Sequence, residues 1–263
     1  MSEALKVPTM AEFLAQGKQP EVLFWVGCAG SFDDRAKKIT KAFARLLNNA
    51  KVDFAVLGIE ESCTGDPAKR AGNEFLFQMQ AMMNIQVLDG YEIKKIVTTC
   101  PHCFNTLKNE YPELGGNYEV MHHTQFLKSL INEGRLKIEG GKFKGKRITF
   151  HDPCYLGRAN NEYEAPRELL QKLEVELIEM KRCKSRGLCC GAGGAQMFKE
   201  PEEGNKDINI ERTEEAIDTK PEIIAAGCPF CNTMMTDGVK AKEKENAIEV
   251  LDVAEMIANA ADL

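Results

Sequence analysis

The chain has 263 residues, of which 43% are hydrophobic, and its 34 Lys and Arg against 40 Asp and Glu leave a net charge of −6. That hydrophobic share excludes a disordered chain, and the acidic balance argues against general nucleic-acid binding, which requires a basic face. The length suits one large domain or two small ones, with a core large enough to make disulfide crosslinks unnecessary.

Residues 1–20 form a short N-terminal extension in which Thr9 and Glu12 predict a capping box for a small helix. The extension lacks the pattern of a secretory signal, and the longest early apolar stretch, Val22–Val26, is far shorter than the ~20 residues of a membrane span. We therefore expect a cytoplasmic protein without a membrane span. Its ten cysteines then stay reduced and indicate metal or redox chemistry.

From residue 21 onward, short apolar strands alternate with helical patterns. In the first half the patterns predict strands at 23–26, 53–57, 95–99 and 119–121, and helices at 33–48, at 73–87 and from 104 to 110. Such alternation is typical of parallel β-α-β units, so the predicted fold class is α/β. The cysteines follow the carboxyl ends of strands, where sheets of this kind place their sites.

The cysteines also reveal an internal repeat. Cys28 and Cys63 lie 35 positions apart, as do Cys154 and Cys189, and each half then closes on a Cys-Pro-x-Cys sequence. A strand-like segment precedes the first cysteine of each half, and a further related segment follows each Cys-Pro-x-Cys. We therefore predict two pseudo-repeated lobes, each with a small, mainly parallel sheet flanked by helices.

The predicted boundaries are 21–141 for the first cysteine-rich repeat and 142–263 for the second. The linker falls near Gly140 and Gly141, in a run rich in lysine and glycine.

The second repeat holds five candidate cofactor ligands, which are Cys154, Cys189, Cys190, Cys228 and Cys231. Five thiols exceed the four of a tetrahedral zinc site or a cubane cluster. Two adjacent cysteines also suit a cluster, whose irons are spread in space, better than one zinc ion. The run Gly191–Gly194 lets backbone N–H groups approach such a group. The alternatives are a structural zinc site with a spare cysteine and, more weakly, a dinucleotide-binding loop.

The first repeat holds four candidate metal ligands, which are Cys28, Cys63, Cys100 and Cys103. Thr64 stands where the second repeat has Cys190. Four thiolates suit a 4Fe–4S cubane and a tetrahedral zinc equally well. A degenerate half that binds nothing is the remaining alternative, although the retained spacing argues against it.

This doubled pattern resembles the cysteine-rich CCG-domain family of iron–sulfur proteins. Members include the heterodisulfide reductase B subunit, the lactate-utilisation iron–sulfur protein and the iron–sulfur subunits of glycolate oxidase and anaerobic glycerol-3-phosphate dehydrogenase. The segments His151–Arg158 and Cys189–Gly194 carry the resemblance most closely. It implies a noncubane 4Fe–4S cluster on the five cysteines of the second repeat. Thr64 departs from the pattern and weakens the expectation of heterodisulfide chemistry on two such clusters.

Several other residues have more than one interpretation. Cys183 lies outside the pattern and is expected to be an unpaired thiol. His102, within its Cys-Pro-His-Cys turn, is a ligand, a hydrogen-bond donor near the site or, more commonly for such a turn, an exposed residue. His151 either tunes a cluster or passes a proton, or is a structural histidine at a strand end. His122 and His123 are expected to serve helix entry and capping.

Three methionines and two neighbouring apolar residues fall at near-helical spacing. We expect them to fill the core, and they are Phe75, Leu76, Met79, Met82 and Met83.

The sequence favours an iron–sulfur electron-transfer subunit of an oxidoreductase complex. Its expected setting is lactate- or glycolate-type 2-hydroxy acid oxidation, or heterodisulfide-reductase-like chemistry. The ferredoxin sequence C-x₂-C-x₂-C-x₃-C-P is absent, so electrons would come from a partner, a ferredoxin-like iron–sulfur subunit or a flavin subunit. The alternatives are a zinc-stabilised structural or interaction protein and a thiol–disulfide oxidoreductase that works through Cys-Pro-x-Cys.

Overall fold

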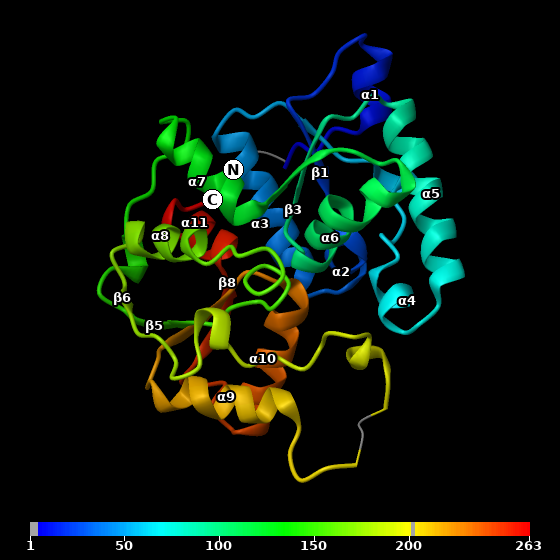
Figure 1. The fold of residues 1–263 in the computed structure, drawn as a ribbon. Helices are drawn as coiled ribbons and strands as arrows, with labels where there is room; N and C mark the ends of the chain where they lie inside the picture. Colours follow the sequence, from blue (N-terminus) through cyan, green and yellow to red (C-terminus); the bar gives the residue numbers. More distant parts are fainter. Residues whose placement is uncertain (1–4, 201–202) are drawn as a thin grey trace.

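A computed structural model describes residues 5–200 and 203–263 of the chain. It contains two four-stranded sheets, and every strand pair in both is parallel (Figure 1). The strands of the first sheet are β1 (Val22–Trp25), β2 (Phe54–Ala55), β3 (Lys95–Thr98) and β4 (Glu119–His122). Those of the second are β5 (Arg147–Phe150), β6 (Glu176–Leu177), β7 (Ile223–Ala226) and β8 (Glu249–Asp252).

The two sheets have the same topology. Their strand orders are β2-β1-β3-β4 and β6-β5-β7-β8, so each has its first and third strands at the centre. The strand direction and the repetition confirm the predicted α/β class with two pseudo-repeated lobes. Each sheet also takes its strands from one of the ranges 21–141 and 142–263. This agrees with those boundaries, which remain a prediction.

The helices of the first repeat and its N-terminal extension are α1 (Met10–Ala15), α2 (Gly27–Phe32), α3 (Ala36–Asn49), α4 (Asp66–Arg70), α5 (Glu74–Gly90), α6 (Pro101–Asn105) and α7 (His123–Asn132). Those of the second repeat are α8 (Glu164–Lys172), α9 (Ile208–Asp218), α10 (Pro229–Ala241) and α11 (Val253–Ala260). Short 3₁₀ turns and one π-helical turn, Thr106–Glu110, complete the chain. The described part of the chain contains no helix long and apolar enough to cross a bilayer.

The predicted elements agree with the structure except at three places. The capping box of Thr9 and Glu12 starts α1 as expected. The helix expected at 33–48 is preceded by a separate short helix, α2, which carries Cys28. The strand expected at 53–57 keeps only two paired residues, Phe54–Ala55. The helix expected from 104 begins earlier, at Pro101, because a proline fits the first turn of a helix, and it continues as the π-helical turn.

A large hydrophobic cluster joins the two repeats. The helices α3 and α7 of the first repeat pack against α11 and α8 of the second. Their buried side chains, among them Phe43, Phe126, Leu170 and Ile257, belong to one continuous cluster that also contains residues of both sheets. In Figure 1 these four helices lie together beside the sheets. The repeats are therefore two halves of one packed body.

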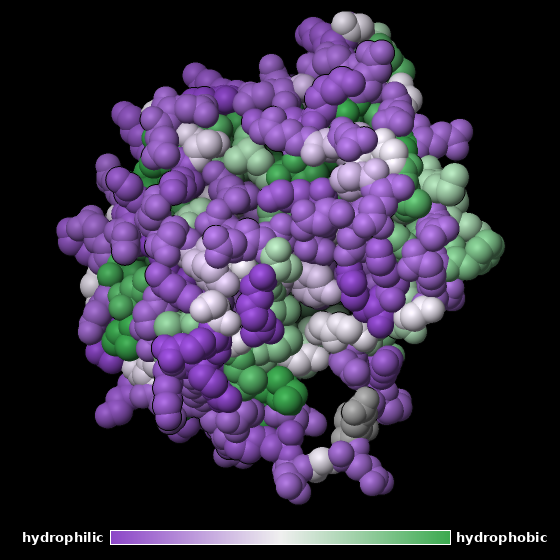
Figure 2. Space-filling view, viewed as in Figure 1, coloured by the Kyte–Doolittle hydropathy of each residue, from purple (hydrophilic) through white to green (hydrophobic). Residues whose placement is uncertain are grey.

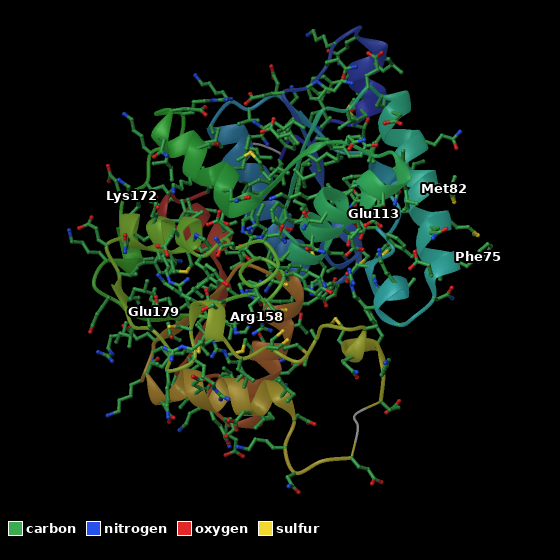
Figure 3. All side chains as sticks on the ribbon, in the orientation of Figure 1. Phe75, Met82, Glu113, Arg158, Lys172 and Glu179 are labelled. Atoms are coloured by element: carbon green, nitrogen blue, oxygen red, sulfur yellow. The ribbon has the colours of Figure 1, made fainter. Side chains whose placement is uncertain are left out.

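The apolar residues of α5 correct a prediction. Phe75 is 76% exposed, Met82 61% and Met83 60%, so these side chains do not fill the core. Phe75 and Met82 point away from the protein in Figure 3, and apolar atoms lie at that edge of Figure 2. The inward face of α5 is formed instead by residues such as Phe77 and Leu88. The helix is apolar on both faces, so periodicity could not identify the buried one.

Exposure of these side chains predicts that they contribute little to stability. Phe75→Ser and Met82→Ser are each expected to change the free energy of unfolding by less than about 0.5 kcal/mol in urea titrations. Core-filling residues would instead lose about 2–5 kcal/mol. A loss in that range would show that α5 is buried on its outer face.

The start of α5 carries a second, smaller prediction. The side-chain oxygen of Asn73 accepts a hydrogen bond from the Leu76 amide at 3.0 Å. Asn73→Ala removes this cap and should destabilise the protein by about 1 kcal/mol, whereas Asn73→Ser should retain most of the stability. Thermal or urea unfolding of the two variants tests the difference, and equal losses would contradict a capping role.

Candidate metal centre

The cysteines of the second repeat lie at the carboxyl edge of its sheet. Cys154 follows β5, Cys228 and Cys231 lie at the start of α10 directly after β7, and an irregular loop supplies Cys189 and Cys190. The Cys154 and Cys189 sulfurs are 4.0 Å apart, and those of Cys190 and Cys231 are 3.3 Å apart. Each of the two adjacent cysteines thus has a further sulfur partner of its own, Cys154 for Cys189 and Cys231 for Cys190. The structure brings all five predicted ligands into one region.

One of these thiols is set to ionise first. Hydrogen bonds from Cys154 and Cys190 hold the pKa of Cys189 well below its usual range, and the Gly191 amide donates to the same sulfur at 3.3 Å. The hydrogen bond with Cys189 raises the pKa of Cys190 to about 12. Cys189 is therefore the thiol of this set that most readily forms a thiolate, the form in which cysteine binds metals.

The four cysteines of the first repeat show the same combination of one thiol with a lowered pKa and a backbone amide close to its sulfur. Hydrogen bonding from Cys28 lowers the pKa of Cys63 to about 7, and the Gly65 amide lies 3.5 Å from the Cys63 sulfur. Gly65 and Gly191 occupy equivalent places after Cys63 and Cys189, and both have left-handed φ angles, 88° and 92°. The left-handed turn that directs each amide toward a sulfur therefore favours glycine.

Thr64 marks the difference between the repeats. Its side chain is buried, and its hydroxyl oxygen lies 3.9 Å from the Cys103 sulfur. The equivalent Cys190 lies 3.3 Å from Cys231, the equivalent of Cys103. Thr64 thus takes the place of the fifth sulfur without changing the local fold.

The two sites meet between the repeats. The thiols of Cys100 and Cys228, one from each Cys-Pro-x-Cys turn, lie close enough for each to shift the pKa of the other. The ring of His102 packs against two aromatic residues of the second repeat, Tyr155 at 4.5 Å and Phe230 at 5.4 Å between ring centroids. The sequence indicated two sets of cysteines, but only the structure shows that they form one continuous sulfur-rich region.

His102 is not an exposed turn residue. It is only 8% exposed, and its Nδ1 lies 2.9 Å from Asp66 Oδ2. Burial opposes protonation, but the bond to Asp66 outweighs it and raises the pKa of His102. A carboxylate from the start of α4 therefore holds the His102 ring in place beside the thiols.

The other three histidines have three different sets of contacts. His122 caps α7 as predicted. His123 makes a contact that the predicted capping role does not include. Its Nε2 lies 2.9 Å from Asp252 Oδ1, and both side chains are fully buried. This bond joins the repeats, and sequence analysis missed it because Asp252 lies 129 positions away. His151 is buried beside the second set of sulfurs.

Two further residues that sequence reasoning missed hold the cysteine loops. Glu61 accepts hydrogen bonds from the Val26 and Gly27 amides at 3.0 and 2.6 Å and so fixes the segment that carries Cys28. Burial raises the pKa of Glu61 to about 7. Its position two residues before Cys63 was the available signal.

In the second repeat, Asp152 likewise holds the segments that carry cysteines. It forms a two-point ion pair with Arg167, at 2.7 and 3.0 Å, and accepts a hydrogen bond from the Lys184 amide at 2.7 Å. Arg167 also binds Glu179 through two contacts. This network connects the segment before Cys154 to the loop that leads to Cys189.

The surroundings of the second site suit a sulfur-bound metal group. His151 Nε2 and both amide atoms of Asn232 are buried and have no hydrogen-bond partner among the described residues. Such atoms need a partner, and Asn232 directly follows Cys231. A thiolate-bound cluster with inorganic sulfur would offer acceptors there. The donor set, nearly all sulfur, fits iron–sulfur or zinc chemistry.

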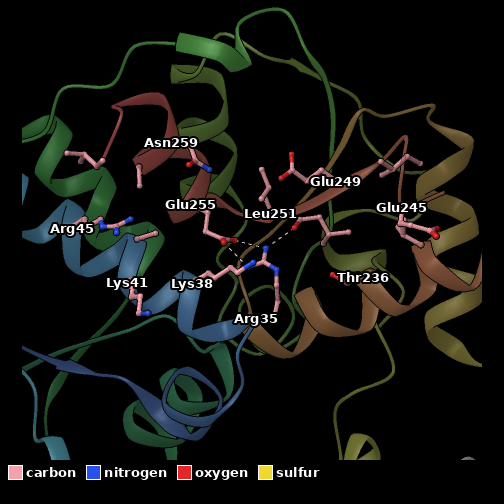
Figure 4. Close-up of a pocket in the computed structure, with 16 residues that line it drawn as sticks. Arg35, Lys38, Lys41, Arg45, Thr236, Glu245, Glu249, Leu251, Glu255 and Asn259 are labelled. Atoms are coloured by element: carbon pink, nitrogen blue, oxygen red, sulfur yellow. Dashed lines mark hydrogen bonds and ion pairs between the residues drawn. The ribbon is translucent and has the colours of Figure 1, made fainter. Parts of the chain in front are cut away.

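Two other features lie apart from these sulfurs. No hydrogen bond joins Cys183 to another cysteine within the described ranges, in agreement with a separate thiol. A surface cavity of about 580 Å³ lies between α3 and the β8–α11 region, and no cysteine lines it (Figure 4). There Arg35 forms an ion pair with Glu255 at 2.7 Å and donates to the Val250 carbonyl, which links the repeats.

Comparison with known proteins identifies several relatives. The chain is 48% identical to a probable iron-sulfur-binding oxidoreductase, FadF, of Bacillus subtilis, covering 96% of this chain and 36% of the relative. It is 47% identical to the EtfAB:quinone oxidoreductase of Syntrophomonas wolfei, covering 92% and 34%. It is 34% identical to one of the subunits of the dihydromethanophenazine:CoB–CoM heterodisulfide reductase of Methanosarcina barkeri, covering 92% and 59%. The chain thus spans about a third of the length of the first two relatives.

The cysteine-rich domain model named CCG matches residues 22–108 and 148–236. Each matched segment contains one of the two sets of cysteines in full. Because the match covers more than half of the chain, the protein belongs to the CCG cysteine-rich domain family.

Proposed function

We propose that this chain is the cluster-binding, electron-transferring part of an iron–sulfur oxidoreductase. The observation that carries the proposal is that two pseudo-equivalent cysteine sets approach each other at Cys100 and Cys228, which shift each other's pKa. A purely structural zinc site gains nothing from such proximity, whereas two redox centres need to be close. The names of the relatives, an iron-sulfur-binding oxidoreductase and a quinone oxidoreductase, support the same class.

The cofactor assignment follows the two sets of ligands. We assign a 4Fe–4S cluster of the noncubane type to the second repeat, on Cys154, Cys189, Cys190, Cys228 and Cys231. The four cysteines of the first repeat would hold a second 4Fe–4S cluster or a zinc ion. Bound clusters of this kind accept and donate single electrons at potentials set by their protein surroundings.

The residues of this chain would tune and shield the centres. Cys100, Cys103, Cys190, Cys228 and Cys231 are buried, so most of the sulfur ligands are protected from water. His102, held by Asp66, packs between the two sets against Tyr155 and Phe230. Together these features shield the junction of the repeats from water.

A partner would supply and remove the electrons. The chain covers only about a third of its first two relatives, so their remaining parts offer further modules. We propose a ferredoxin-like iron–sulfur or a flavin subunit as the immediate partner. The relative from Methanosarcina barkeri favours disulfide-type chemistry, and the 2-hydroxy acid setting remains a prediction.

Anaerobic purification followed by iron, zinc and acid-labile sulfide analysis and electron paramagnetic resonance (EPR) tests this function. We expect iron and sulfide in the ratio of at least one 4Fe–4S cluster per chain, with a signal that responds to reduction. Zinc without labile sulfide would contradict the proposal and favour the structural alternative.

Exchange of the residue that differs between the repeats tests the assignment of cluster type. Cys190→Thr gives the second repeat the four-cysteine set of the first, and it should change the EPR signal of the second-repeat cluster. Thr64→Cys gives the first repeat five cysteines and should bring a signal of the second-repeat type to that site, since Thr64 already lies 3.9 Å from Cys103. Unchanged spectra in both variants would show that the fifth cysteine is not a ligand.

A further inference from the structure

His151 is fully buried. Its ring nitrogen Nδ1 forms a hydrogen bond, whereas Nε2 lacks a hydrogen-bond partner among the described residues. His151 follows β5 directly, and its Nδ1 accepts a hydrogen bond from Arg212 Nε at 3.0 Å. Arg212 is itself fully buried and is held by the Arg182 carbonyl at 2.7 Å and by Glu215 at 3.0 Å. The donor that faces Nδ1 is therefore fixed in place on α9.

This contact determines where the imidazole carries its proton. An arginine Nε–H can only donate, because the guanidinium does not lose its proton in proteins. Nδ1 must then be an acceptor, so we assign the proton of the neutral ring to Nε2.

The imidazole ring of His151 lies next to the second set of sulfurs. One ring nitrogen of His151 and the sulfurs of Cys190 and Cys231 all lie within 4.8 Å of one another. Nε2 has no access to solvent, and no described residue accepts its proton. By distance alone the three residues resemble a metal-binding group, but a nitrogen that bears a proton has no lone pair for a metal.

We propose that His151 is not a ligand but a positioning residue, whose Nε2–H donates a hydrogen bond to a sulfur of the second-repeat cluster. This inference rests on the proposed cluster in that repeat. A hydrogen bond to sulfur stabilises the reduced, more negative state of a cluster and so raises its reduction potential. Arg212 acts through His151 by fixing the tautomer.

The first repeat offers an independent indication. Trp25 precedes Cys28 by three residues, as His151 precedes Cys154. Trp25 is fully buried, its Nε1 also lacks a partner among the described residues, and its side chain belongs to the same buried cluster as Cys100 and Cys103. An indole N–H can donate but can never bind a metal. The two repeats therefore share a buried N–H donor at this place, not a ligand.

Redox titration of anaerobically prepared full-length variants tests the proposal. His151→Leu should retain the iron and sulfide content of the wild type, while its one-electron reduction equilibrium constant falls about tenfold, a potential lower by about 59 mV. His151→Gln, whose amide can donate from nearly the same place, should recover most of the difference. An unchanged potential in His151→Leu, with clusters intact, would overturn the proposal.

A measurement on the wild-type protein guards against a variant that fails to fold. Pulsed EPR of protein with ¹⁵N-labelled histidine should show a weakly coupled nitrogen and a nearby exchangeable proton. A strongly coupled, directly bonded nitrogen would overturn the proposal and make His151 a ligand. Absence of iron and sulfide from the wild-type protein would overturn the proposed function as well, so the two failures are distinguishable.

Discussion

Cys231→Ser is expected to abolish the iron and acid-labile sulfide of the second repeat and leave the first-repeat centre in place. Cys231 is buried, and its sulfur lies 3.3 Å from that of Cys190, in the interior of the predicted ligand set. A serine hydroxyl stays protonated at neutral pH and is a poor ligand for iron in a thiolate site. Metal and sulfide analysis with EPR of the purified variant measures the loss.

Cys183→Ser is the matched control, because it changes the same atom in the same repeat outside the pattern. Cys183 is only partly buried, and no hydrogen bond joins it to another cysteine in the described part of the chain. The Cys183→Ser variant should retain the full wild-type content of iron and sulfide. Equal losses in the two variants would contradict the division of the cysteines into five ligands and one separate thiol.

Arg167→Met is expected to lower the free energy of unfolding by about 3–5 kcal/mol. Arg167 and Asp152 each expose only 4% of their side chains, and the substitution leaves the Asp152 carboxylate buried without its cation. Glu179, which is 36% exposed, can turn toward water, so Asp152 carries most of the cost. Urea unfolding of the metal-free variant and wild type, compared under one condition, measures the change.

The comparison variant for this prediction is Arg135→Met, which removes an arginine from a pair at the surface. Arg135 is 29% exposed and contacts Glu21, which is 39% exposed, at 2.7 Å. Such pairs contribute less than about 1 kcal/mol. A loss for Arg167→Met no larger than that for Arg135→Met would show that water reaches Asp152.

Because one Asp152 oxygen also fixes a chain segment, the effect of Arg167→Met should extend to the metal site. Asp152 Oδ2 accepts from the Lys184 amide, and this holds the loop that leads to Cys189. We expect slower cluster assembly in the variant even where the folded protein is recovered. Iron uptake during reconstitution, followed by absorbance, gives the rate.

The alternation of strand and helix patterns was sufficient to predict the α/β class, and the doubled cysteine spacing was sufficient to predict the two lobes, while the two ligand sets remain a prediction. A fixed spacing records a repeated structural unit, and each unit places its cysteines at the carboxyl edge of a parallel sheet. The proximity of Cys100 and Cys228 could not be predicted in this way, since it depends on how the two sheets pack. Long-range partners such as His123 and Asp252 were missed for the same reason.

The errors at His102 and α5 have a different origin. His102 was expected on an exposed turn, but Asp66, 36 residues earlier, reaches the same place in the fold. The outer face of α5 is as apolar as its inner face, so burial could not be assigned from composition. In both cases the neighbouring sequence could not show which distant residues would, or would not, cover the side chain.

The core shared by α3, α7, α8 and α11 has a consequence for any attempt to divide the protein. A fragment ending at residue 141 would expose the side chains of α3 that pack against α11, including Phe43, and would lose the carboxylate that faces His123. The complementary fragment would expose Ile257 in the same way. Despite its repeated sequence, the chain should therefore melt in one cooperative transition, and neither half should be recovered as an independent soluble module.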